Sequence, residues 1–173
     1  MSTNWRISSF NGALLAAYFI PTWTIIAYRI MVSPIQSFYE RQNVSLAFFA
    51  SDHLHFAADG MVRSAWMLAL GRMTVVAFFA IFLMLLTLSV IRRKGNANEA
   101  LAMALGIGSV MCFAMMLMAS VVHEPEALRL HATELLMLLG NAIIMLIEPP
   151  AKEAAAEQDV ASALQQAQFV DNR

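Results

Sequence analysis

Four segments of the chain are almost purely apolar, and charged residues separate them. No charged side chain occurs at 7–28, 73–91 or 100–122. A hydrocarbon core about 30 Å thick needs roughly 20 apolar residues at a rise of about 1.5 Å per residue. Each of these three segments is therefore expected to cross the membrane as a helix.

A fourth span is predicted between two proline signals. Pro125 suits a first helical turn, and the pair Pro149 and Pro150 marks a stop. The uncharged run inside this segment, 135–147, is short. A full span must therefore include the acidic residue Glu134.

These segments lack the strict alternation of β-strands, which favours helices over a barrel. We expect an all-α integral membrane protein with four transmembrane helices in a bundle. The predicted spans are about 8–33, 62–91, 99–122 and 126–148. They lie in a membrane domain of residues 1–150, and the polar residues 151–173 form a cytoplasmic tail.

The segment between the first two spans has the pattern of an amphipathic helix. Apolar positions recur at helical spacing, while acidic and hydroxyl side chains repeat on another face. We predict an interfacial helix at about 44–58 on the outer face, which Gly60 ends.

The composition of the chain is that of a membrane protein. Hydrophobic residues make up 60% of the chain and charged residues 13%, too little polar surface for an ordinary soluble enzyme. The net charge is −1, so nucleic acid is not an expected partner. The single cysteine excludes an internal disulfide.

The densest basic cluster predicts the orientation. Arg92, Arg93 and Lys94 lie in a short loop, which the positive-inside rule places in the cytoplasm. Both termini are then expected in the cytoplasm. The simplest location is a bacterial inner membrane, since no organelle presequence is recognised.

Polar residues inside the predicted spans are the first candidates for function. Glu134, Asn141 and Glu148 recur every seven residues and share one helix face. We expect Arg72 to contact Glu134, because a charge in lipid needs a partner. This pair either fixes helix register or, with Asn141, lines a transport path.

The histidines offer a second candidate site. All four lie on or near the predicted outer side, where imidazole can bind zinc, copper or haem iron. The alternative is that they bond to loop carbonyls or water. The possible metal ligands are His53, His55, His123, His131 and Glu134.

Small residues in the third span form a stripe at i, i+4 spacing. The stripe consists of Ala100, Ala104, Gly108 and Cys112. Such residues let a second helix approach closely, within the chain or between subunits.

No motif for nucleotide hydrolysis, zinc proteolysis, serine hydrolysis or thiol redox chemistry occurs in the chain. The first hypothesis is a non-enzymatic membrane subunit without a cofactor, in contact with lipid and either homo-oligomeric or accessory to a larger membrane complex. One alternative is an outer-face metal- or haem-binding protein that uses His53, His123, His131 and Glu134. The other is a small channel or transporter lined by Arg72, Glu134 and Asn141.

Overall fold

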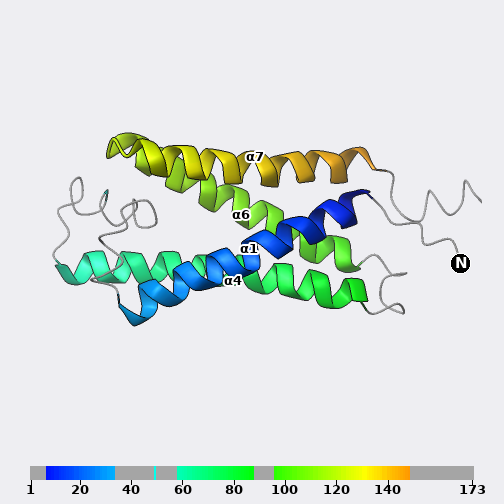
Figure 1. The fold of residues 1–173 in the computed structure, drawn as a ribbon, viewed down its shortest axis with the longest axis horizontal. Helices are drawn as coiled ribbons and strands as arrows, with labels where there is room; N and C mark the ends of the chain where they lie inside the picture. Colours follow the sequence, from blue (N-terminus) through cyan, green and yellow to red (C-terminus); the bar gives the residue numbers. More distant parts are fainter. Residues whose placement is uncertain (1–6, 34–48, 50–57, 88–95, 149–173) are drawn as a thin grey trace, which may run out of the picture.

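Four long helices make up nearly all of the described structure. The computed structural model describes residues 7–33, 49, 58–87 and 96–148 (Figure 1). The helices are α1 (Ile7–Val32), α4 (Ala58–Thr87), α6 (Asn96–Val121) and α7 (Pro125–Ile147). Each is long and apolar enough to cross a membrane, as predicted. The predicted interfacial helix at 44–58 lies almost entirely outside the described residues, as does the tail at 151–173.

The start of α4 differs from the prediction. The helix begins at Ala58, and Gly60 lies inside its first turn instead of ending a preceding helix. A glycine lowers helix stability by about 1 kcal/mol but does not stop a helix that strong helix formers continue. Ser64, whose hydroxyl donates to the Met61 carbonyl at 2.8 Å, already belongs to this regular helix.

A tight turn joins α6 to α7. His123 adopts a left-handed conformation with a φ of 56°. The amide of Glu124 donates to the carbonyl of Ala119 at 3.0 Å, and the amide of His123 donates to that of Ser120 at 3.4 Å. This is the Schellman pattern that ends many helices, with histidine where glycine is usual. Pro125 then starts α7, so the two helices form an antiparallel hairpin.

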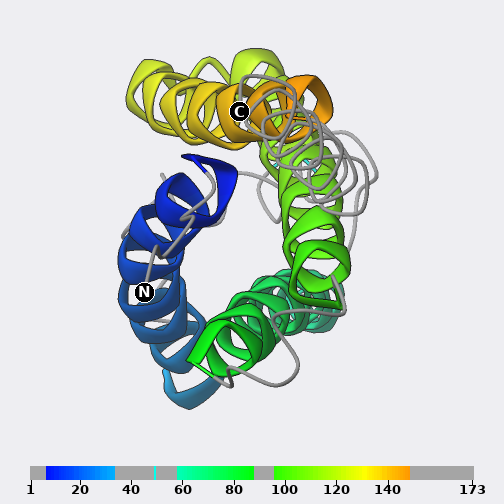
Figure 2. The same cartoon turned by 90° about the vertical axis from the view of Figure 1, so that its right-hand side faces the viewer.

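The four helices form a ring in which, of the neighbouring pairs, α1 and α7 make the fewest contacts with each other. We call this α1–α7 interface the seam. Seen end-on, they follow one another in the order α1, α4, α6, α7 (Figure 2). α1 packs mainly along α4, α4 along α6, and α6 along α7, whereas α1 and α7 have far fewer contacts. The bundle thus consists of two hairpins that pack through α4 and α6.

Aromatic and small side chains fill the interior. The Phe19 ring stacks on Phe79 at 5.6 Å between ring centres and meets Trp23 edge-on at 5.0 Å. The small-residue stripe of α6 is buried, and Gly108 lets α7 approach so closely that an added Cβ would lie 3.2 Å from Leu138. The stripe therefore makes helix contacts within the chain.

Large apolar side chains also cover the outside of all four helices. Examples, each more than half exposed, are Phe10, Tyr28, Met67, Val110, Leu136 and Leu146. In water such a surface would be unfavourable, but it suits lipid or neighbouring membrane helices.

Candidate functional site

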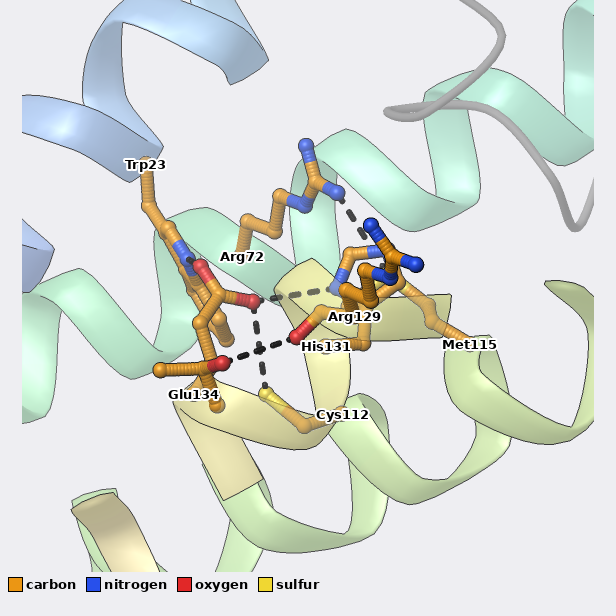
Figure 3. A network of polar contacts seen from close by, with 8 residues as sticks. Trp23, Arg72, Cys112, Met115, Arg129, His131 and Glu134 are labelled. Atoms are coloured by element: carbon orange, nitrogen blue, oxygen red, sulfur yellow. Dashed lines mark hydrogen bonds and ion pairs between the residues drawn. The ribbon is translucent and has the colours of Figure 1, made fainter. Parts of the chain in front are cut away.

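Glu134 of α7 is the centre of a buried network of polar contacts (Figure 3). The indole Nε1 of Trp23 on α1 donates to Glu134 Oε1 at 2.9 Å. Nδ1 of His131, one turn earlier on α7, lies 3.0 Å from Oε2. The thiol of Cys112 on α6 donates to the same oxygen at a longer 3.8 Å.

Arg72 is the second charged group of this network and lies in the middle of α4. Only 1% of its surface is exposed. Its Nη2 donates to the Sδ of Met115 at 3.4 Å, and its guanidinium carbon lies 5.8 Å from the centre of the Trp23 ring. Arg72 and Glu134 are close enough to attract each other electrostatically. Trp23 therefore contacts both members of the pair that we expected from the sequence.

All four helices contribute to this site, which we call the polar cluster: Trp23, Arg72, Cys112, Met115, His131 and Glu134. Trp23, Cys112 and Glu134 are each nine residues from the nearer end of their helix, about 13 Å along the axis. Three helices thus bring their polar side chains to one level, well inside the apolar length of the bundle.

Charge balance makes the polar cluster tolerable in an apolar interior. An isolated carboxylate or guanidinium in such surroundings is very unfavourable, whereas a paired and hydrogen-bonded one is not. The arrangement also brings an imidazole and a carboxyl group into direct contact. Chemically, the cluster can fix helix positions and can hold a proton.

Asn141 continues the same buried face of α7 toward the other end of the bundle. It lies two turns beyond Glu134 and is 3% exposed. Among the residues that the structure describes, neither its side-chain nitrogen nor its oxygen has a hydrogen-bond partner. A buried carboxamide without a hydrogen-bond partner is unusual, because burial of an unsatisfied polar group is unfavourable.

Glu148, the third residue of the predicted heptad, caps the start of α1. Its Oε1 accepts hydrogen bonds from the amides of Ile7 at 2.7 Å and Ser8 at 3.2 Å, and the Ser8 hydroxyl donates to Oε2. A carboxylate at this position satisfies the free amides of the first helical turn and suits the helix dipole. Since Ile7 and Glu148 touch, α1 begins at the end of the bundle where α7 finishes.

The structure does not assemble the suggested metal ligands. His123 is exposed in the α6–α7 turn, while His131 and Glu134 are buried in the polar cluster. His53 and His55 lie outside the described residues. Within the described ranges, no three His, Cys, Asp or Glu side chains are grouped so as to hold a metal ion.

Trp23 and Met115 were not predicted from the sequence to belong to the polar cluster. One signal for Trp23 was available: tryptophans of membrane proteins are enriched at the two interfaces, and this one lies nine residues inside its helix. An indole so deep in a span needs an acceptor for its N–H. Met115 gave no comparable signal, because methionine is also a common apolar filler.

Comparison with known proteins adds no relative: no family model matches this chain, and neither a curated protein nor a solved structure matches it.

Proposed function

We propose that this chain is a non-enzymatic integral membrane subunit that acts through its outer surfaces, as a homo-oligomer or as an accessory part of a larger membrane complex. The observation that carries the proposal is the polar cluster, to which every helix contributes and in which Trp23, His131 and Arg72 make internal contacts. Such a cluster suits a fixed scaffold.

Partners would bind to the outer surface of this scaffold. Large apolar side chains are exposed on all four helices, and in a membrane they can contact either lipid or another helix. The apolar segment predicted as an interfacial helix at 44–58 would add a second surface at the outer boundary.

The proposed orientation places both termini in the cytoplasm of a bacterial inner membrane. The Glu148 contact with Ile7 and Ser8 supports a common side for the two ends of the helical domain. The basic residues at 92–94 support the cytoplasm as that side. Reporter fusions to each terminus and within the segment 88–95 test it: all three should report the cytoplasm.

The assembly itself is tested by native mass spectrometry. The full chain is expressed at its natural level, extracted in mild detergent and weighed with everything that co-purifies. We expect a defined number of copies or stoichiometric membrane partners. A monomer without partners contradicts the proposal, and stoichiometric haem, copper or zinc in the same sample would favour the metal-binding alternative.

A further inference from the structure

We propose that Glu134 and His131 form an intramembrane proton-binding site, reached from the Glu148 end of the bundle along the α7 face that carries Asn141. The ligand is the hydrated proton. This function goes beyond a scaffold, because it requires the polar cluster to exchange with water.

Glu134 is distinguished from the other described acidic residues by its position. It is buried inside a span, where an ionisable group is unfavourable and usually has a function. The others lie at or next to helix ends: Asp59, Glu99, Glu124, Glu126 and Glu148.

Groups from every helix face this carboxyl. α1 supplies the indole of Trp23 and, within electrostatic range, the phenol of Tyr18. α4 supplies the guanidinium of Arg72, and α6 supplies the thiol of Cys112. α7 supplies the imidazole of His131, which is the second proton acceptor.

The proton is taken up without any other reactant. A hydronium ion transfers one proton to the pair and leaves as water. The pair then holds the proton either as imidazolium and carboxylate or as imidazole and carboxylic acid, with the same total charge. Release to water reverses the step. The 3.0 Å separation between His131 Nδ1 and Glu134 Oε2 allows the two forms to interconvert.

Asn141 marks the route. Its buried amide has no hydrogen-bond partner in the described part of the chain. A carboxamide donates and accepts at once, so it can join a chain of hydrogen-bonded water. The seven-residue repeat puts it between Glu134 and Glu148 on one face, and Glu148 is a proton acceptor at the end of that face.

Infrared difference spectroscopy of the full chain in lipid bilayers tests the site. As the pH is lowered, a C=O stretching band of a carboxylic acid should appear. Glu134→Gln should remove that band. Glu126→Gln, at an exposed position in the first turn of α7, should keep it. Equal amplitude of the band in Glu134→Gln overturns the proposal, and so does the absence of both this band and the ring bands of an imidazolium.

A second variant covers the case in which Glu134→Gln does not assemble. Trp23→Phe keeps the carboxyl group but removes its hydrogen bond from α1, so the frequency of the band should shift. An unshifted band shows that it arises elsewhere and overturns the assignment.

The route is tested by transfer into heavy water. Asn141→Leu should slow deuterium exchange of the Glu134 band about tenfold. The substitution replaces a side chain that can hydrogen-bond water on the proposed route with an apolar one. Ile143→Leu, on the exposed side of the same helix, is the control and should leave the rate unchanged. An unchanged rate in Asn141→Leu overturns the route.

Discussion

Removing the hydrogen bond from Trp23 to Glu134 should loosen the bundle at the seam between α1 and α7. Trp23→Phe deletes the Nε1 donor, 2.9 Å from the carboxylate, and keeps an aromatic ring beside Phe19. Trp66→Phe is the matched control, since Trp66 of α4 is 48% exposed.

Two magnitudes bracket the effect. A hydrogen bond between membrane helices contributes about 0.6 kcal/mol on average. A hydrogen bond to a charged group contributes about 1.5 to 3 kcal/mol. Glu134 is almost completely buried, so the upper range applies, and we expect Trp23→Phe to lower the free energy of unfolding by about 2 kcal/mol. Trp66→Phe should change it by less than about 0.5 kcal/mol.

The only thiol of the chain supplies the assay. Cys112 is fully buried and lies in the polar cluster, so a maleimide reaches it only when the bundle opens. When opening is fast compared with labelling, the labelling rate follows the population of the open state. A loss of about 2 kcal/mol raises that population about 30-fold.

Equal labelling rates in Trp23→Phe and Trp66→Phe would contradict this prediction, because the hydrogen bond would then contribute nothing to the contact between α1 and α7. Helicity measured by circular dichroism should stay unchanged in both variants, which separates a loosened seam from loss of the helices.

Four further changes test the packing and the helix ends, and detergent-induced unfolding measures the stability of each variant. Gly12→Ala should lower the free energy of unfolding by about 1 kcal/mol, since the new Cβ would lie 2.8 Å from Leu101. Gly106→Ala should raise the free energy of unfolding by up to about 1 kcal/mol, because a Cβ added there would point into open space. If Gly106→Ala were less stable than Gly12→Ala, the packing at these two glycines would be contradicted. His123→Gly should also raise the free energy of unfolding by about 1 kcal/mol, because glycine adopts the positive φ of 56° without strain; no gain would mean that the histidine side chain stabilises the turn. Glu148→Ala should speed hydrogen exchange of the first amides of α1 and cost about 1 kcal/mol; unchanged exchange would argue against the cap.

The four spans could be predicted from the sequence because membrane helices are defined by length and apolarity alone. The bounds of α7 follow directly from its prolines, and the structure places them at Pro125 and Ile147. The prediction at Gly60 was wrong because a glycine near a span resembles a helix end, while the helix formers that continue α4 decide the local structure.

The residues that α4 and α7 contribute to the polar cluster could be predicted from the sequence, whereas the residue that α1 contributes could not. Charge inside a span is a strong signal, so Arg72 and Glu134 could be selected at once. The rotation of α1 about its axis leaves no such signal, because its apolar residues surround the helix on all sides. The side that Trp23 faces is decided by the neighbouring Phe19, which stacks on Phe79 of α4, and by the need of the indole N–H for an acceptor.

The seven-residue polar repeat of α7 explains how the ring closes where packing is weakest. Apolar helix faces gain little by leaving lipid, which is equally apolar, whereas a hydrogen bond has no substitute there. α1 and α7 share little apolar packing, yet Glu134 binds Trp23 and Glu148 binds the start of α1. Two carboxylates fourteen residues apart, one inside α7 and one at its C-cap, thus hold α1 at two levels. The same repeat leaves Asn141 buried between them, at the level where a scaffold alone would have placed an apolar side chain.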